Sequence, residues 1–193
     1  MSKIFYHNTN KFDALTRDSV VILQSHHEIH DGKSFYVMYS VASLGDMGSP
    51  DDMITLTWTT ANTTELAHFQ FIGIGSAGWR LRLIEAPSGG GADPTGSLTI
   101  LNKKRNSSNT SGFIDLASAA NKVSYDATLA TGGTTLWDQY FEGSGGPLSG
   151  GTAGGERDEM PLKENTKYQL SLYGTDANPA TLYMKWYEEE GAT

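Results

Sequence analysis

The strongest constraint on the fold is a series of short runs in which apolar and polar residues alternate. In Met53–Thr60, the residues Ile54, Leu56 and Trp58 alternate with threonines, and Lys167–Tyr173 has the same period. A period of two places the apolar side chains on one face of an extended chain, so each run predicts a half-buried β-strand. The candidate strands are Ser34–Val41, Met53–Thr60, Leu66–Ile72, Trp79–Ile84, Ser97–Leu101, Val123–Leu129, Thr135–Phe141, Lys167–Tyr173 and Thr181–Tyr187.

Turn residues separate these runs. Asp31-Gly32 precedes Ser34–Val41, and an Asp-Gly pair favours a tight hairpin turn, so His26–His30 is predicted as the opposing strand. Gly174–Pro179 separates the last two candidate strands and predicts an antiparallel hairpin at the end of the fold. Phe113–Lys122 is the only helical candidate, with room for one or two turns.

Length and composition favour a single domain. The chain has 193 residues, with 22 glycines, 6 prolines and no cysteine, which suits many turns between short strands. We expect an all-β fold, an antiparallel β-sandwich of jelly-roll-like form in residues 21–193, preceded by a mobile N-terminal arm of residues 1–20. Gly143–Gly155 is predicted to be a mobile surface loop, because its small residues cannot bury enough surface to offset their ordering entropy.

The charge of the chain argues against nucleic acid as a partner. A net charge of −8 repels phosphate backbones, and the densest basic cluster, Lys103-Lys104-Arg105, is interpreted as a solvated turn at a strand end. No run approaches the roughly 20 apolar residues that span a bilayer, and the N-terminal residues lack the apolar run of a signal peptide. We therefore expect a soluble protein made in a cytoplasm, with no membrane partner.

Gly73–Gly78 matches the pattern G-x-G-x-x-G. A dinucleotide site needs a helix to begin at these glycines, because the helix N-terminus holds the pyrophosphate. Trp79–Ile84 instead alternates as a strand. The glycines are therefore interpreted as a turn between two antiparallel strands, with no nucleotide cofactor.

The histidine-rich segment before Gly32 offers a possible metal site. On a strand, His26, Glu28 and His30 would share one face at a spacing of roughly 7 Å, where they could meet on one metal ion. The helical zinc motif is not met, because Asp31 stands where its second histidine belongs. The sequence favours a polar hairpin face without a metal, and whether His26, Glu28 and His30 bind one stays open.

The sequence contains no recognisable catalytic constellation. There is no G-x-S-x-G motif and no cysteine nucleophile, and the pair of carboxylates of a glycosidase cannot be picked out. Asp51-Asp52, Asp158-Glu159 and Glu188–Glu190 are interpreted as solvated charges. We expect a non-enzymatic protein without cofactor, and assign no catalytic, cofactor-binding or metal-binding residue.

Three segments, taken in order, resemble a known group of proteins. They are His27–Phe35 (HEIHDGKSF), Lys104–Ser111 (KRNSSNTS) and the C-terminal stretch Arg157–Glu190. The matching residues of that stretch are Arg157, Asp158, Glu159, Leu162, Lys163, Asn165, Thr166, Lys167, Tyr168, Leu182, Trp186, Tyr187 and Glu188. Together they resemble tailed-phage virion structural proteins, a group that includes head decoration (capsid cement) proteins. The resemblance is carried by the ordered combination and is densest after Arg157.

The resemblance implies a virion protein on the capsid surface, a β-sandwich that assembles as a homotrimer. The leading hypothesis is a decoration protein that binds the major capsid protein and stabilises the head by bridging capsid subunits. It also implies a structural role for Asp158-Glu159. The alternative is a host- or carbohydrate-binding β-sandwich module on a phage tail or fibre, with Trp137 and Tyr140 as an aromatic platform. A polysaccharide depolymerase has the least support, because no acid–base pair is found.

Overall fold

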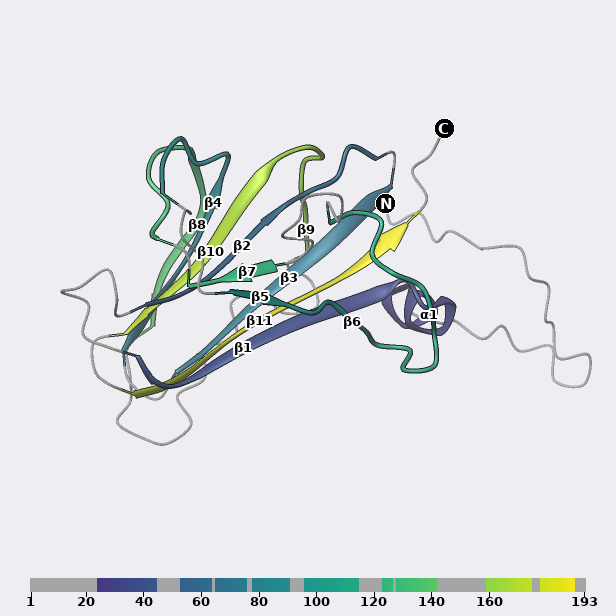
Figure 1. The fold of residues 1–193 in the computed structure, drawn as a ribbon, viewed down its shortest axis with the longest axis horizontal. Helices are drawn as coiled ribbons and strands as arrows, with labels where there is room; N and C mark the ends of the chain where they lie inside the picture. The colour runs from purple at the N-terminus through teal and green to yellow at the C-terminus, as the bar shows by residue number, and fades with distance from the viewer. Residues whose placement is uncertain are drawn as a thin grey trace, which may run out of the picture.

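The computed structural model describes residues 24–44, 53–63, 65–75, 78–90, 96–114, 123–126, 128–141, 159–174 and 178–189. These ranges contain one short helix and eleven strands (Figure 1). The elements are α1 (Gln24–Asp31), β1 (Ser34–Leu44), β2 (Met53–Thr59), β3 (Leu66–Gly75), β4 (Trp79–Glu85), β5 (Gly96–Leu98), β6 (Leu101–Asn102), β7 (Val123–Tyr125), β8 (Thr134–Phe141), β9 (Met160–Pro161), β10 (Lys167–Gly174) and β11 (Asn178–Glu189). The predicted arm of residues 1–20 and the predicted loop Gly143–Gly155 lie outside the described residues.

The strands form two antiparallel sheets that pack face to face (Figure 1). The first sheet has the order β6-β1-β11-β3-β9, and the second has the order β5-β7-β2-β10-β4-β8. The chain alternates between the sheets from β1 to β4 and again from β8 to β11. This is a double-sheet jelly roll, so the predicted all-β sandwich is confirmed.

Inward-facing side chains of both sheets form one core that is rich in aromatic rings. The ring of Trp58 on β2 lies 5.7 Å from that of Tyr168 on β10, and 6.2 Å and 5.9 Å from those of Phe69 and Phe71 on β3. Phe69 in turn stacks on Trp186 of β11 at 5.3 Å. All five rings are buried. Because aromatic side chains bury large apolar areas, this cluster contributes strongly to the cohesion between the sheets.

The predicted C-terminal hairpin is wrong. β10 lies between β2 and β4 in the second sheet, whereas β11 lies between β1 and β3 in the first sheet. The link near Gly174–Pro179 therefore passes from one sheet to the other. Both strands do bury the predicted face, as Leu172 and Leu182 illustrate. Alternation specifies which residues point to the core, but it does not specify which strand lies alongside.

The predicted N-terminal hairpin is also wrong, because His26–His30 lies in the helix α1 and not in a strand. Gly32 has a φ of 74°, which only glycine adopts readily. Its N–H donates to the carbonyl oxygen of Ile29 at 3.1 Å, and the N–H of Lys33 donates to that of Glu28 at 2.8 Å. These two bonds form a Schellman cap at the C-terminus of α1. A glycine with positive φ suits both a hairpin turn and a helix end, so this signal does not distinguish them.

Several shorter elements differ from the predicted ones. Ser97–Leu101 does not form one strand, because β5 and β6 belong to different sheets. Val123–Leu129 is extended only as far as Tyr125, where β7 ends. In the helical candidate Phe113–Lys122, the first two residues are not helical, and Ile114 forms a β-bridge with Thr60. The remainder of that candidate lies outside the described residues.

The threonine face of β2 is buried, which departs from the predicted half-buried strand. Thr55 and Thr57 are 0% and 6% exposed. The amide of Gln169 on β10 donates to Thr57 Oγ1 at 3.2 Å and to the carbonyl oxygen of Thr128 at 2.9 Å, and accepts the N–H of Ala130 at 2.6 Å. These bonds hold residues 128–130 against the outer face of the second sheet, where they exclude water from β2.

The glycine cluster serves packing between the sheets. Gly73 and Gly75 lie near the end of β3, and Trp79 begins β4 in the other sheet, so the predicted turn between two paired strands is wrong. A Cβ atom on Gly73 would lie 2.9 Å from Cζ3 of Trp79, and one on Gly75 would lie 3.0 Å from its Cδ1. The two glycines therefore leave room for the buried indole ring, which accounts for their spacing.

The interpretation of Glu188 as a solvated charge is wrong, because its carboxylate is buried and ties the segment before residue 114 to β11. It accepts hydrogen bonds from the hydroxyl of Ser111 at 2.5 Å, from the N–H groups of Gly112 and Phe113 at 2.9 and 3.3 Å, and from Nε1 of Trp186 at 2.9 Å. Burial raises the pKa of Glu188, and these hydrogen bonds oppose the rise. The Glu188 carboxylate thus satisfies four donors, and the bonds from Ser111, Phe113 and Trp186 are buried.

Hydrogen bonds near the C-terminus of α1 join the three segments that carry the phage resemblance. Nζ of Lys104 donates to the carbonyl oxygen of His30 at 2.7 Å, so the second segment covers the C-terminus of α1 in the first. Ser111 joins the second segment to Glu188 in the third. The N–H of Glu188 also donates to the carbonyl oxygen of Lys33 at 3.0 Å. The scattered motifs therefore form one connected piece of the scaffold.

We expect Glu188→Ala to lower the free energy of unfolding by about 3–5 kcal/mol, because it leaves several buried donors without an acceptor. Urea unfolding followed by tryptophan fluorescence measures this change. The matched control is Glu189→Ala, since that neighbouring side chain is 25% exposed and its loss should cost only about 0.5 kcal/mol. Equal losses in the two variants would show that Glu188 is not the anchor.

Candidate interaction surface

Alternate residues of β1, β11 and β3 point away from the core and form the outer face of the first sheet. The register places Met38 of β1 beside Tyr183 of β11, and Tyr183 beside Ile72 of β3. Ile74 continues the same face along β3, and Tyr36 continues it along β1 in the opposite direction. We call these five side chains the apolar surface.

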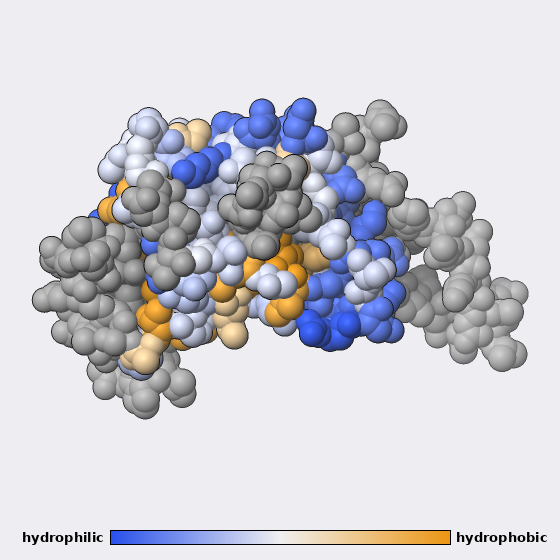
Figure 2. Space-filling view, viewed as in Figure 1, coloured by the Kyte–Doolittle hydropathy of each residue, from blue (hydrophilic) through white to orange (hydrophobic). Residues whose placement is uncertain are grey.

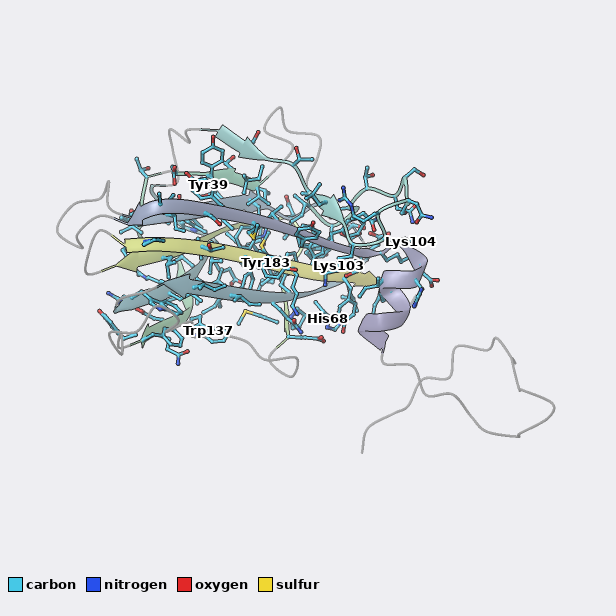
Figure 3. The ribbon with its side chains drawn as sticks, turned by 90° about the horizontal axis from the view of Figure 1, so that it is seen from below. Tyr39, His68, Lys103, Lys104, Trp137 and Tyr183 are labelled. Carbon is cyan, nitrogen blue, oxygen red and sulfur yellow. The ribbon has the colours of Figure 1, made fainter. Side chains whose placement is uncertain are left out.

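The apolar surface is open to solvent at its two sides. Met38 is 57% exposed and Ile74 is 47% exposed. The rings of Tyr36 and Tyr183 lie 5.9 Å apart. Partial burial, reinforced by Tyr36, raises the pKa of Tyr183. Figure 3 looks onto this face, with Tyr183 near its middle. Adjacent exposed apolar side chains of this size are typical of surfaces that bind another molecule.

Polar side chains close one end of this outer face. Glu159, which precedes β9, accepts the hydroxyl of Tyr187 at 2.6 Å and the amide of Gln70 at 3.2 Å. The ring of His68 stacks on Tyr187 at 4.8 Å and lies between the carboxylates of Glu159 and Glu189, at 3.6 and 3.5 Å. Burial, and then the bond to Glu159, raise the pKa of Tyr187. These contacts give Glu159 a role in holding β9 to the sheet, while Asp158 lies outside the described residues.

On the face shown in Figure 2, the two ends of the molecule differ in hydropathy. In Figure 2 the end that carries α1 and β6 is hydrophilic, and apolar residues gather towards the middle and the opposite end. The helix and its covering segment therefore add little apolar area to the exterior.

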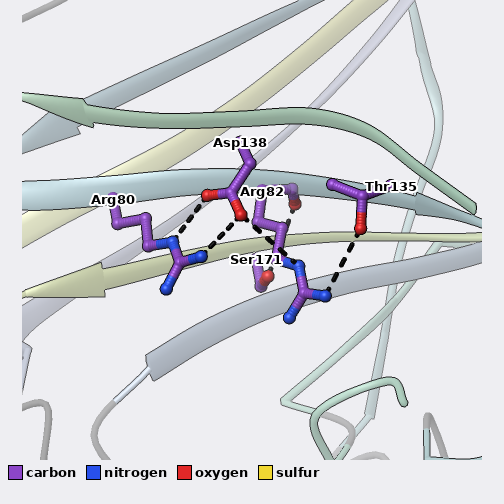
Figure 4. Close-up of polar contacts among 5 residues, drawn as sticks. All are labelled: Arg80, Arg82, Thr135, Asp138 and Ser171. Carbon is purple, nitrogen blue, oxygen red and sulfur yellow. Dashed lines mark hydrogen bonds and ion pairs between the residues drawn. The ribbon is translucent and has the colours of Figure 1, made fainter. Parts of the chain in front are cut away.

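The outer face of the second sheet differs, because its charges are paired in place (Figure 4). Arg80 donates twice to Asp138 at 2.6 and 2.5 Å, and its guanidinium lies 4.7 Å from the ring centre of Tyr140. Arg82 lies 4.0 Å from the same carboxylate and bonds Thr135 at 3.4 Å. The hydrogen bonds from Arg80 lower the pKa of Asp138. This face holds its own charged groups in mutual contacts.

The described residues of the histidine-rich segment do not share one face, as the predicted metal site required. On α1, residues two apart point in different directions, and Glu28 is buried while His30 is exposed. The side chain of His26 lies outside the described part of the chain. Within the described ranges, no group of three His, Cys, Asp or Glu residues is arranged to hold a metal ion.

The predicted aromatic platform is not formed either. Trp137 lies opposite the core residue Leu83 and packs against the core, whereas Tyr140 lies opposite Arg80 on the outer face. The two side chains therefore point to opposite sides of β8. Tyr140 alone is strongly exposed, at 62%.

Comparison with known proteins identifies no relative. No family model, no curated protein and no solved structure matches the chain. Among the described residues, no helix has the length and apolar character needed to cross a membrane. The candidate surface therefore rests on the geometry of the outer face itself.

The apolar surface should contribute little to the stability of the fold. We expect Met38→Ala to change the free energy of unfolding by less than about 0.5 kcal/mol, because the side chain is exposed. Met184 points inward from the neighbouring strand and is 0% exposed, so Met184→Ala should cost about 2–5 kcal/mol. Parallel urea unfolding of the two variants measures this difference. A large loss for Met38→Ala would mean that Met38 belongs to the core.

Proposed function

We propose that the protein is a phage capsid decoration protein that binds the outside of the head through the apolar surface. The observation that carries the proposal is the exposure of Met38 and Ile74 on either side of the partly buried Tyr183, on the three long strands of the first sheet. A free-standing protein gains nothing from such side chains in water, whereas a partner that covers them removes apolar area from solvent. The resemblance of the three connected segments to phage virion proteins names the partner as the major capsid protein.

The jelly roll is compatible with this proposal but does not distinguish it from the carbohydrate-binding alternative. The same fold serves viral capsid proteins and lectins, so function must be argued from the surface. The alternative carbohydrate-binding module depended on a platform of Trp137 and Tyr140, and these side chains point to opposite faces. The outer face of the first sheet instead offers a broad patch, which suits a protein surface better than a single sugar ring.

The proposed mechanism is interface burial repeated over a symmetric lattice. Each copy covers the junction of neighbouring capsid subunits and binds the assembled head but not the separated subunits. Binding to one state alone stabilises that state by mass action. A homotrimer, as the resemblance implies, multiplies the effect because three linked contacts dissociate together.

We expect the variant Met38→Lys/Ile74→Lys to lose binding to phage heads assembled without this protein, because two ammonium groups would have to be desolvated against the capsid. Co-sedimentation with such heads measures the affinity, and we expect a loss of about a hundredfold. The wild-type protein should also raise the temperature at which these heads release their DNA, and the variant should not.

Leu66→Lys is the matched control for this experiment. Leu66 is 49% exposed on the same face of the same strand as Ile74, but lies eight residues away along β3, outside the apolar surface. It should bind the heads as the wild type does. The proposal fails if the wild-type protein is monomeric at micromolar concentration and ignores the heads, or if the control and the variant lose binding equally.

A further inference from the structure

Two lysines lie at the edge of the apolar surface and come from distant parts of the sequence. Lys185 on β11 lies directly opposite Tyr36 on β1. Lys103 follows β6 on the other side of β1, and its N–H donates to the carbonyl oxygen of Ser34 at 2.9 Å. The register of β6 with β1 points Lys103 to the same outer face, diagonally across β1 from Lys185. Figure 3 shows Lys103 on the side of Tyr183 that faces α1.

Neither ammonium group has a carboxylate partner among the described residues. The ion pairs of that part of the chain involve other cations, and the neighbouring Lys104 donates to the carbonyl oxygen of His30. Gln70, the other cross-strand neighbour of Lys185, bonds Glu159, which is itself engaged with Tyr187. Burial, and then the repulsion from Lys185, lower the pKa of Lys103. Two like charges are thus held near each other beside apolar side chains.

We propose that Lys103 and Lys185 together bind a carboxylate of the capsid partner, so that the surface takes a protein segment in which an Asp or Glu side chain adjoins apolar residues. This inference rests on the proposed function and names the chemistry of its partner. A carboxylate placed between the two ammonium groups replaces their repulsion by two charge-assisted hydrogen bonds. The adjoining apolar residues of that segment would cover Met38 and Tyr183.

A nucleic acid fits this surface less well than an acidic protein segment. Phosphate backbones are bound by many basic side chains along an extended track, whereas here two lysines stand in a chain of net charge −8. One carboxylate satisfies two lysines, and the neighbouring apolar surface has no counterpart on a phosphate backbone.

The test compares the binding of three double variants to heads assembled without this protein. Lys103→Gln/Lys185→Gln should weaken binding about tenfold or more and flatten its dependence on salt, because it removes the charged contact. Lys103→Arg/Lys185→Arg keeps both charges and should retain most of the affinity. Lys104→Gln/Arg105→Gln removes the same net charge from the adjacent turn and should bind as the wild type does.

Zero-length carbodiimide coupling on the same heads identifies the partner group directly. It joins an amine to a carboxylate, so mass spectrometry should find Lys103 or Lys185 linked to an Asp or Glu of the capsid protein. If the glutamine variant binds normally while Met38→Lys/Ile74→Lys does not, the inference falls and the proposed function stands. Competition by a short oligonucleotide without any such cross-link would assign the lysines to phosphate and overturn the inference. If the wild type does not bind the heads, both fall.

Discussion

The contact between Trp58 and the two phenylalanines of β3 is the interaction on which the rest of the structure depends. The chain has no cysteine, so no disulfide joins the two sheets. The chain crosses between the sheets repeatedly, and each crossing is favourable only if both inner faces are buried together. Trp58, Phe69 and Phe71 meet across that interface and draw in Tyr168 and Trp186. Because this burial lies on the inner faces, either outer face can carry other chemistry without weakening the contact between the sheets.

The sequence was enough to predict which side chains of a strand point to the core and which point away from it. It was not enough to predict which strands pair with each other. Ile54, Leu56 and Trp58 do point to the core. The partners of β10 and β11 could not be inferred, because their alternation is the same and pairing is decided by contacts with strands more than eighty residues away. The local signals failed where one residue type suits two structures, as glycine does in both a tight turn and the cap of α1.

The apolar surface was less predictable than the fold, because it is assembled from three strands, β1, β11 and β3. Tyr36 and Met38 fall at the outward positions of a strand whose inward positions are also apolar, and that unusual two-sided pattern was the one available signal. Ile72 and Tyr183 join them only through the register of β11 with β1 and β3. The pairing of Lys103 with Lys185 depends in addition on β6, a two-residue strand that no pattern distinguishes.

The outer faces of the two sheets differ in how their charged and apolar side chains are arranged, and the composition of the chain does not show this difference. On the second sheet, Arg80 and Arg82 are held by Asp138, and residues 128–130 bury the polar face of β2. On the first sheet, the carboxylate of Glu159 likewise accepts a hydrogen bond, from Tyr187. The apolar surface and the two lysines lie on the outer face of the same sheet, and no described residue covers or pairs with them. An acidic protein that places two lysines beside the apolar surface is asymmetric in both charge and hydropathy. Under the proposed function, that asymmetry selects the outer face of the first sheet for contact and indicates an opposing surface with a carboxylate beside apolar residues.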